Sequence, residues 1–592
     1  MPRWGLTKEQ RESRPWGIEP KLLAPDKTIT DPIHGEVFVT ELERRIIDTR
    51  SFQRLRRIRQ LGTAHLVYPS ATNSRFSHAL GALRAAQNIL DVVLDQRNNK
   101  ERVPDIFDQW RDDANYDKKK IDAQIARAVV LCRLGALLHD LGHVPFGHTL
   151  EDDLNLLEAH DKNEERFEHY WSEIEQTSGI KLDKRLVRCL RIIVLSDLNK
   201  DKPKDEGKKK EELPLEFRFV KDLVGNTICA DLLDYLPRDH YFSGLPAQLG
   251  RRFLDGSYVR KSTEKYHPSR FTIRLYRNKR YRVDVVTELY KYLQYRYELT
   301  ERVLYHHAKL AADVMLGKLV NAWRQSLLAE VKSDSARVNW AEEKLNKSVQ
   351  DILEARVREK GDDALLEQLV EEARGKKSDD WPVVAKVGDA LLRRRLYKLL
   401  VRCTSAGDRA EDIYQVFGSR DNRAALEAKV AQFVGIDPSQ VALWIPSPKM
   451  REKVPQVIVQ SKSGTRILAH ESSSKGREII ESHHKLWSIA LYVEPEIKGL
   501  DEEVLLAALA DELEIDWDAP VAGSAKLADV LASRAAKAEG LDDAESRLLR
   551  QALAASEQLM NFRTGKAMTY EDLFEVAADR AKRIKKTRKK KR

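Results

Sequence analysis

The segment LGALLHDLGHVPFGHTLE, residues 134–151, decides the fold of the region around it. Its first half carries apolar residues at helical spacing, and Gly142 and Pro145 then end the predicted helix. At that end, His139 and Asp140 offer an imidazole nitrogen and a carboxylate oxygen side by side, which are donor types that one divalent cation accepts together. The segment therefore predicts a helix whose end contributes to a metal site.

One His-Asp pair is weak support for a metal site, because His160 and Asp161 form a second pair in the same chain. Two further donors strengthen the prediction. His78, within SRFSHALG, and Asp231, within ADLLDY, each interrupt an apolar helical run. Burying an unpaired imidazole or carboxylate is costly, and a shared cation offsets that cost. The alternative for each residue taken alone is a hydrogen-bonded core histidine or an ion-paired aspartate; three such residues in order favour a metal site built from three helices.

Helical periodicity extends on both sides of this segment. Apolar residues recur at i, i+3 and i+4 spacing in residues 42–62, 74–96, 121–143 and 299–323. Three stretches instead alternate like β-structure: residues 269–283, residues 454–470 and residues 486–496. The pattern predicts a mainly α fold with a helical core, a smaller α+β C-terminal lobe and a helical C-terminal appendage.

The length of 592 residues allows two or three separately packed units. We expect five segments in chain order: an N-terminal lead-in (1–26), the helical core (27–320), the α+β lobe (321–498), the helical appendage (499–580) and a basic tail (581–592).

The composition, with 42% hydrophobic and 33% charged residues, is typical of a soluble globular protein. No stretch approaches about 18 consecutive apolar residues, so we predict no membrane-spanning helix. The N-terminal residues lack the apolar run of a signal peptide, and we therefore expect a cytoplasmic protein. The four cysteines lack CxxC spacing, which argues against a zinc knuckle or a disulfide framework and predicts buried or neutral thiols.

The basic tail, residues 581–592, carries most of the chain's net charge. Its sequence AKRIKKTRKKKR has nine Lys or Arg residues and no acidic residue, and without it the net charge of +10 falls to +1. Such a segment binds nucleic acid through phosphate contacts, or it is a solvated, solubilising tail. The sequence leaves both interpretations open.

Four blocks extend the metal pattern into a family resemblance: DPIHGEVFVTELERRIIDTRSFQRLRRIRQLG (31–62), YPSATNSRFSHALG (68–81), LGALLHDLGHVPFGHTLE (134–151) and ADLLDYLPRDHYFSG (230–244). Together they resemble the deoxynucleoside triphosphate triphosphohydrolases of the HD superfamily, both the enzymes that also carry a SAM domain and their bacterial relatives. The likeness spans about residues 27–498, which makes the helical core an expected HD phosphohydrolase core. We expect no SAM domain, because only residues 1–26 precede the matching region.

The resemblance implies a metal site and a reaction. The implied ligands are His78, His139, Asp140 and Asp231, with Mn, Fe, Zn or Mg as the divalent ion. The metal would activate a water for attack on the α-phosphorus, so that the deoxynucleoside leaves through its 5′ oxygen and the tripolyphosphate stays whole.

The resemblance also implies the catalytic histidines. His143, His148 and His160 match family histidines that line the phosphates. His148 matches the general acid that protonates the 5′ oxygen, and Glu151, three residues on, is expected to orient it. His143 is expected to donate to the α-phosphate.

Substrate contacts are implied at six positions: Gln60, Leu61, Arg75, Tyr235, Asp239 and Arg296. Arginine binds phosphate in a bidentate way, and a dry wall at Gln60 and Leu61 would reject a ribose 2′-hydroxyl. Asp239 is expected to accept a hydrogen bond from the 3′-hydroxyl. The chain departs from the family at Leu232, where the family has a cation, and at Leu304, where it has a sugar-stacking tyrosine; Tyr305 lies one step further.

An activator site is implied at a subunit interface. Asp48, Gln53 and Arg56 match positions that bind a guanine nucleotide, and three basic residues match positions around a neighbouring nucleotide: Lys27, Arg277 and Lys279. The implied protein is a homo-oligomer activated by GTP or a dNTP, with a tetramer as the expected assembly. The alternative is an amphipathic helix with a basic outer face.

Three functions follow from these residues. The first is dNTP hydrolysis, with dNTP depletion in antiviral defence as one use of it. The second is an HD-type phosphodiesterase or nuclease, and the third is a nucleotide sensor without catalysis. The residues expected at the sugar edge favour the first. The appendage would dock a partner protein through its Leu-rich helices or cap the C-terminal lobe.

Overall fold

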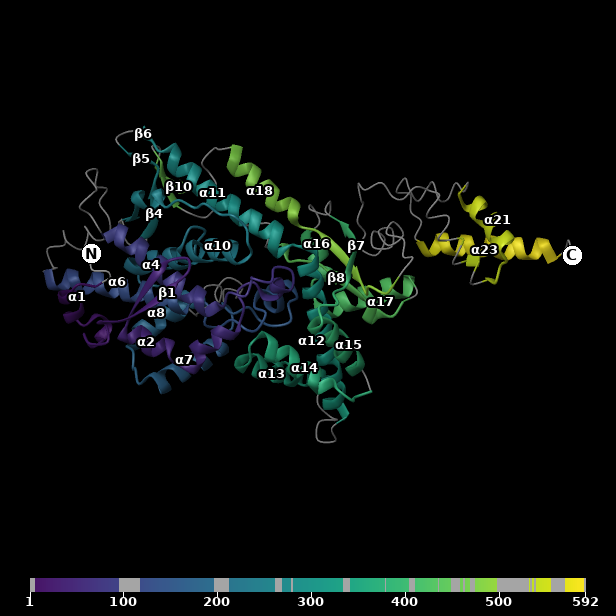
Figure 1. Ribbon diagram of the computed structural model, residues 1–592, viewed down its shortest axis with the longest axis horizontal. Helices are drawn as coiled ribbons and strands as arrows, with labels where there is room; N and C mark the ends of the chain where they lie inside the picture. Colours follow the sequence, from purple (N-terminus) through teal and green to yellow (C-terminus); the bar gives the residue numbers. More distant parts are fainter. Residues whose placement is uncertain are drawn as a thin grey trace. The chain divides into compact units, whose positions relative to one another are not determined.

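The computed structural model describes most of the chain, and Figure 1 shows its helices and strands. The described residues are 6–94, 118–195, 212–260, 269–277, 280–333, 341–377, 380–403, 410–434, 436–448, 458–461, 464–468, 474–497, 532, 535–536, 539–554 and 570–589. They are mainly helical, which confirms the predicted fold class. The chain forms two compact units. Unit 1 contains Met1–Lys309, Ala322–Gly388 and Glu452–His483, and unit 2 contains Leu310–Asn321, Asp389–Arg451 and His484–Arg592.

Most of the helices belong to unit 1. These are α1 (Lys8–Glu12), α2 (Glu41–Ile47), α3 (Arg50–Gln53), α4 (Arg75–Leu94), α6 (Lys118–Leu138), α7 (Glu164–Ser178), α8 (Lys184–Val194), α9 (Arg218–Gly225), α10 (Ala230–Phe242), α11 (Val283–Leu299), α13 (Glu342–Glu359) and α14 (Asp362–Ala373). Three helices have residues in both units: α12 (His307–Ser333), α15 (Trp381–Leu392) and α18 (Ser474–Leu486).

Three helices form the centre of unit 1, where α4 packs between α10 and α6 (Figure 1). Ala79, Ala82 and Ala86 of α4 are fully buried, and their small side chains let neighbouring backbones approach closely. Helix α6 is apolar on most of its surface and is buried from Gln124 to Leu138 with few breaks. This packing brings the N-terminal ends of α4 and α10 to the C-terminal end of α6.

Strands of unit 1 form three small sheets. Strands β1 (Pro25–Asp31) and β2 (Gly35–Thr40) make an antiparallel hairpin, as do β5 (Tyr276–Arg277) and β6 (Arg280–Tyr281). A four-stranded sheet has the order β10-β9-β4-β3, built from β3 (Ser257–Arg260), β4 (Arg270–Arg274), β9 (Ile458–Ser461) and β10 (Gly464–Ile467), with β4 parallel to β9. The hairpins expected in residues 269–283 and 454–470 are therefore present, and the second pairs with β4 of unit 1.

Unit 2 contains a three-stranded antiparallel sheet in the order β7-β11-β8, formed by β7 (Lys398–Cys403), β8 (Val441–Trp444) and β11 (Ile489–Val493). Apolar side chains of α16 (Ala410–Phe417) and α17 (Arg420–Val434) share its core. Strand β11 lies within the predicted strand 486–496, and every one of its residues is buried. Further along the chain, α21 (Asp543–Ala554) packs on α23 (Tyr570–Lys589).

The described residues can be compared with two expectations from composition, on membrane-spanning helices and on the cysteines. None of the described helices is long and apolar enough to cross a membrane. Cys132, Cys189 and Cys229 are buried free thiols.

Candidate metal centre and the adjoining histidines

Four predicted ligands meet where three helices of unit 1 converge. His78 lies in the first turn of α4, Asp231 in the first turn of α10, and His139 and Asp140 directly follow α6. The Nε2 atom of His78 lies 3.1 Å from Nε2 of His139 and 3.2 Å from Oδ1 of Asp231. Asp140 places its carboxylate oxygens 3.5 Å from His78 Nε2 and 3.4 Å from His139 Nε2. Two nitrogens and two carboxylates therefore face one point.

The donor chemistry at this point fits a divalent cation. Nδ1 of His78 pairs with Asp234 at 2.7 Å, and Nδ1 of His139 pairs with the carbonyl of Ala136 at 2.8 Å. With the proton of each neutral ring on Nδ1, both Nε2 atoms present lone pairs toward each other and toward the carboxylates. Such a set repels itself unless a cation or added protons lie between the donors. The residues can thus hold a metal, and an N₂O₂ set is compatible with Zn, Fe or Mn.

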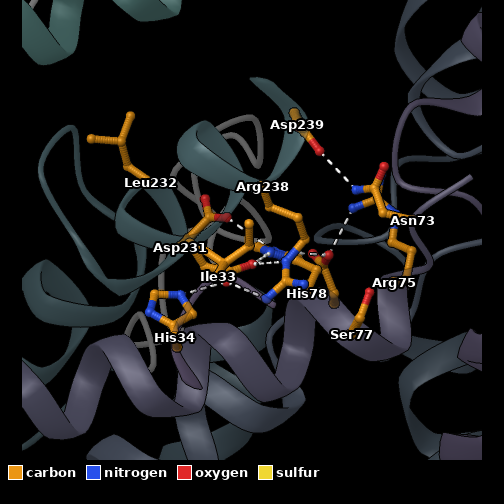
Figure 2. Close-up of polar contacts among 12 residues, drawn as sticks. Ile33, His34, Asn73, Arg75, Ser77, His78, Asp231, Leu232, Arg238 and Asp239 are labelled. Atoms are coloured by element: carbon orange, nitrogen blue, oxygen red, sulfur yellow. Dashed lines mark hydrogen bonds and ion pairs between the residues drawn. The ribbon is translucent and has the colours of Figure 1, made fainter. Parts of the chain in front are cut away.

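A second layer of polar residues fixes His78. The carboxylate of Asp234 accepts from His78, from His34 at 2.7 Å, and from Arg238 at 2.9 and 2.7 Å, while Arg238 also pairs with Asp31 at 2.8 Å. Figure 2 shows His34, His78 and Arg238 gathered in this network. The turn between β1 and β2 supplies His34, so this hairpin reaches the metal residues from the side opposite the proposed ion.

Gly81 makes this second layer possible. A Cβ atom there would lie 1.7 Å from Oδ1 of Asp234 and 2.4 Å from Nη2 of Arg238. Only glycine leaves room for the carboxylate against α4. Sequence reasoning quoted the blocks that contain His34, Gly81, Asp234 and Arg238 but assigned no role to them. The available signal was their position, since each lies within a few residues of a predicted ligand or inside one of the blocks that carry the family resemblance.

The electrostatics concentrate negative charge at the proposed ion. Burial alone would lower the pKa of His78, but hydrogen bonds with Asp231 and Asp234 raise it to about 10. Burial favours the neutral form of Asp231, yet His139 and His78 hold its pKa well below the ordinary value. Asp140 shows the same outcome through His139 and Arg75. Both carboxylates are therefore ionised, and a metal cation would take the place of the imidazole protons.

Three further histidines gather beside the metal residues. The rings of His143 and His160 stack with their centroids 3.5 Å apart. The centroid of the His148 ring lies 4.9 Å from that of His143 and 5.6 Å from that of His160. Asp140 joins the two groups, because its Oδ1 lies 3.3 Å from Nε2 of His143. The structure brings all the predicted metal and phosphate-facing residues into one region.

The partner of His148 differs from the prediction. Nδ1 of His148 pairs with Asp152 at 2.6 Å, whereas Glu151 pairs with Nδ1 of His160 at 3.0 Å. Residues 149–153 form a π-helical turn that points the Glu151 side chain inward, fully buried against Arg166, and leaves Asp152 half-exposed beside His148. The carboxylate paired with His148 is therefore Asp152, whereas Glu151, expected there, pairs with His160.

The two stacked histidines have opposite charge preferences. Burial and the nearby Arg75 guanidinium lower the pKa of His143 to about 4, so its ring is neutral. Burial would also lower the pKa of His160, but Glu151 raises it to about 9. A neutral and a cationic imidazole thus lie face to face, which suits a site that receives negative charge.

Arg75 connects the metal residues to the expected sugar wall. Its Nη1 donates to Oδ2 of Asp140 at 2.7 Å, and its Nη2 lies 3.5 Å from the carbonyl of Gln60. The side chain is almost fully buried. A guanidinium fixed in this way presents its remaining N–H groups to an anion without a further ordering cost.

Asn73, to which the sequence analysis assigned no role, contacts two of the expected sugar-binding residues, Gln60 and Asp239. Asn73 donates to Asp239 at 2.8 Å, as Figure 2 shows, and its carbonyl accepts from the Gln60 amide at 2.9 Å. Burial raises the pKa of Asp239 to about 7. Leu61 is buried. Burial raises the pKa of the Tyr235 hydroxyl, and the nearby Arg296 guanidinium opposes this shift only in part.

The departures from the family pattern have structural counterparts. Leu232 is buried in the apolar core of unit 1. Helix α10 continues through Pro237. Residues Thr300–Leu304 form a π-helical turn, and of Leu304 and Tyr305 the tyrosine is the more buried side chain.

The expected activator residues come from several elements of unit 1. Asp48 is exposed and accepts from Arg44 at 2.8 Å, and Arg56 donates to Gln53 at 2.7 Å while its guanidinium stacks 3.6 Å from the Phe76 ring. Of the other three positions, Lys27 lies exposed on β1, Arg277 lies exposed on β5, and Lys279 is outside the described residues.

Two family models match the chain. The HD domain matches residues 115–223, which include His139 and Asp140, and the HD associated region matches residues 341–520. This chain is an HD-domain protein. Its HD segment contains the three histidines expected to face the phosphates, whereas His78 and Asp231 lie on either side of that segment.

Relatives of this HD-domain protein include an uncharacterized protein, YwfO of Bacillus subtilis, 30% identical over 313 residues, which are 51% of this chain and 57% of that protein. The deoxynucleoside triphosphate triphosphohydrolase SAMHD1 of Gallus gallus is 30% identical over 245 residues, covering 38% of this chain and 36% of its own length. A SAMHD1 homolog of Dictyostelium discoideum is 30% identical over 225 residues, 37% of each protein. The chain thus spans at most about three fifths of these relatives.

A solved structure supports the fold. A phosphohydrolase from Bacteroides thetaiotaomicron aligns with a TM-score of 0.50 and 19% identity, over 79% of this chain and 100% of that one. At this identity the likeness concerns the fold alone.

Proposed function

We propose that this HD-domain protein is a metal-dependent dNTP triphosphohydrolase that releases deoxynucleoside and tripolyphosphate. One observation carries the proposal: Asp140 belongs at once to the N₂O₂ donor set and to the histidine group, with contacts of 3.4 Å to His139 and 3.3 Å to His143. A phosphate bound across that carboxylate would meet the cation on one side and imidazole donors on the other. The likeness to SAMHD1 proteins supports a dNTP as the substrate.

The chain's residues divide the reaction between them. A bound metal would supply Lewis-acid activation of the attacking water and of a phosphoryl oxygen. Arg75 and the cationic His160 would balance the charge of the triphosphate. His148 would donate its Nε2 proton to the departing 5′ oxygen, because Asp152 holds Nδ1 and so keeps the other nitrogen free for the substrate.

The sugar would lie against Gln60, Leu61, Tyr235 and Asp239. Leu61 offers an apolar surface, and a ribose 2′-hydroxyl placed there would lose its hydration without a partner. The Asn73 amide fixes the Asp239 carboxylate, which would accept from the 3′-hydroxyl. Arg296, next to Tyr235, would approach the phosphates.

The test is product analysis with matched variants. Purified protein with Mn²⁺ or Mg²⁺ is incubated with each dNTP, alone and mixed with GTP, and products are separated by ion-exchange chromatography. Deoxynucleoside with intact tripolyphosphate, lost in the His139→Ala/Asp140→Ala variant, is the expected result. Cleavage of a nucleic acid or cyclic nucleotide in place of dNTPs would instead support a phosphodiesterase, and no turnover of any substrate would support a sensor.

We further propose nucleotide activation in a homo-oligomer. Asp48, Gln53 and Arg56 lie within one short surface segment, and an Asp carboxylate accepts both N–H groups of a guanine edge. Lys27, Arg277 and Lys279 would serve a neighbouring nucleotide from other elements. An activating GTP or dNTP would then bind where subunits meet, and a tetramer is the expected assembly.

Two cellular roles are proposed from the sequence: nucleic-acid binding by the basic tail and dNTP depletion in antiviral defence. The basic tail would bind nucleic acid, which a salt-dependent binding assay with and without residues 581–592 checks. The reaction would deplete dNTPs during antiviral defence in the cytoplasm, and cellular dNTP pools with and without the His139→Ala/Asp140→Ala variant check this.

A further inference from the structure

Helices α13 and α14 contact the segment that carries the phosphate-facing histidines, although they follow it by about two hundred residues. Two carboxylates make the connection: Asp362 in the first turn of α14 contacts the segment directly, and Glu354 in α13 reaches it through Arg166 of α7. Asp362 is fully buried, and the Glu354 side chain is 13% exposed. Neither residue belongs to the metal or phosphate groups described above, so their burial calls for a separate explanation.

Asp362 holds a strained turn of the histidine segment. Phe146 has φ of 61° and Gly147 has φ of 43°, and a side chain at such an angle makes the backbone costly to keep. Oδ1 of Asp362 accepts the Phe146 amide at 2.8 Å. The turn lies between His143 and His148, so its geometry sets how far apart those two rings stand.

The same carboxylate also holds the expected sugar wall. Oδ2 of Asp362 accepts the Arg59 amide at 2.8 Å, one residue before Gln60. Gly361, at the start of α14, lets the helix approach this segment closely, because a Cβ there would lie 2.4 Å from the carbonyl oxygen of Arg57. One buried group therefore joins the histidine turn to the Gln60 and Leu61 segment.

Glu354 acts through a chain of buried charges. It accepts from Nη2 of Arg166 at 2.9 Å, and Nη1 of Arg166 donates to Glu151 at 3.3 Å. Glu151 in turn accepts from Nδ1 of His160 at 3.0 Å. Because the Arg166 and Glu151 side chains are fully buried, loss of Glu354 would leave the Arg166 charge undercompensated and free to pull Glu151 away from His160.

We propose that Asp362 and Glu354 are positioning residues of the active site, through which the HD associated region holds the histidine segment 143–151 in its reactive geometry. The effect on rate rests on the proposed function, whereas the effect on the segment's backbone does not. The associated region would thus complete the active site, and its helices α13 and α14 would be required for full activity even though they supply no group to the substrate.

The test compares Asp362→Asn with Asp363→Asn in the full chain. Both oxygens of Asp362 accept backbone N–H groups, so an asparagine offers one acceptor and sets its NH₂ against the other N–H. Asp363 is the matched control, because it is 65% exposed and its carboxylate accepts from the Arg59 guanidinium rather than from backbone N–H groups. Hydrogen exchange of peptides covering residues 143–151, bound metal content, kcat and KM are measured for each.

In Asp362→Asn we expect faster exchange in residues 143–151, unchanged metal content and a kcat lower by about 10- to 100-fold, the range for a small misplacement of reacting groups. Asp363→Asn should match the wild type. Equal exchange and equal kcat in the two variants would overturn the role of Asp362.

If Asp362→Asn fails to fold, Glu354→Gln carries the comparison against Glu343→Gln, an exposed position on the same helix. Faster exchange around Glu151 and a lower kcat in the first variant alone support the proposal, and identical behaviour overturns it. If the wild type turns over no dNTP, the proposed function fails, and the exchange comparison still decides the positioning roles.

Discussion

At the scale of single residues, Asp234 matters as much as the ligands it supports. Its carboxylate receives hydrogen bonds from His34 and His78 and a bidentate pair from Arg238, all buried. A carboxylate behind a metal-binding imidazole fixes the tautomer and makes the ring a better donor. The identity of residue 234 therefore controls whether Nε2 of His78 can bind a cation.

Asp234→Asn should weaken metal binding by about 10- to 100-fold, because an amide has a single acceptor oxygen for these donors. Metal affinity is measured by titration with Mn²⁺ and by metal analysis of purified protein. Asp222→Asn is the matched control, since Asp222 is a buried carboxylate paired with Arg270 away from the metal residues. Equal loss of metal in both variants would assign the effect to general destabilisation.

Asp239 predicts a pH dependence of substrate binding. Burial raises its pKa to about 7, so the carboxyl is neutral below that pH and ionised above it. An ionised carboxylate is the stronger acceptor for the 3′-hydroxyl. KM for a dNTP should therefore fall as pH rises through about 7, and a 2′,3′-dideoxynucleotide, which lacks that hydroxyl, should show no such change. The same pH dependence with both substrates would contradict the role of Asp239.

At the scale of elements, the π-helical turn Thr149–Asp153 directs two neighbouring carboxylates to different histidines, Asp152 to His148 and Glu151 to His160. Asp152→Asn should lower kcat by about tenfold or more with little change in thermal stability, because it removes the partner of exposed His148, the proposed general acid. Glu151→Gln should lower the melting temperature, because Glu151 is the buried counter-charge of Arg166 and His160. Kinetics and thermal melting of the two variants check this, and the reverse pattern would restore Glu151 as the partner of His148.

Sequence patterns predicted the elements better than the contacts between them. Helical periodicity located α4, α6, α10 and α12, and alternation located β11, because these patterns depend on local spacing alone. The assignment of Glu151 to His148 failed because spacing of three residues assumes an α-helix, and the turn is π-helical. Asn73, Asp362 and Glu354 were missed because their partners lie far away in the chain, where periodicity carries no information.

At the scale of the whole molecule, the candidate site depends on residues spread over most of unit 1. His34 comes from the first hairpin, the proposed ligands from three central helices, and Asp362 from the region matched by the HD associated model. The HD domain alone, residues 115–223, lacks His78, Asp231 and both positioning carboxylates. Its match therefore identifies the family, whereas the completed site requires the longer chain.

The surface residue Asp48 predicts how the protein assembles into oligomers. Asp48→Ala should abolish nucleotide-dependent association, because it removes the carboxylate expected to bind a guanine edge, while the monomer keeps its fold: the Arg44–Asp48 pair is exposed and contributes little to stability. Asp389→Ala breaks an exposed pair of the same spacing, with Arg393, and serves as control. Light scattering after gel filtration, with and without GTP and dNTPs, should show a larger species for the wild type and the control only. A wild type that stays monomeric under every condition would exclude an interface site, and dNTP hydrolysis would then have to proceed without subunit contacts.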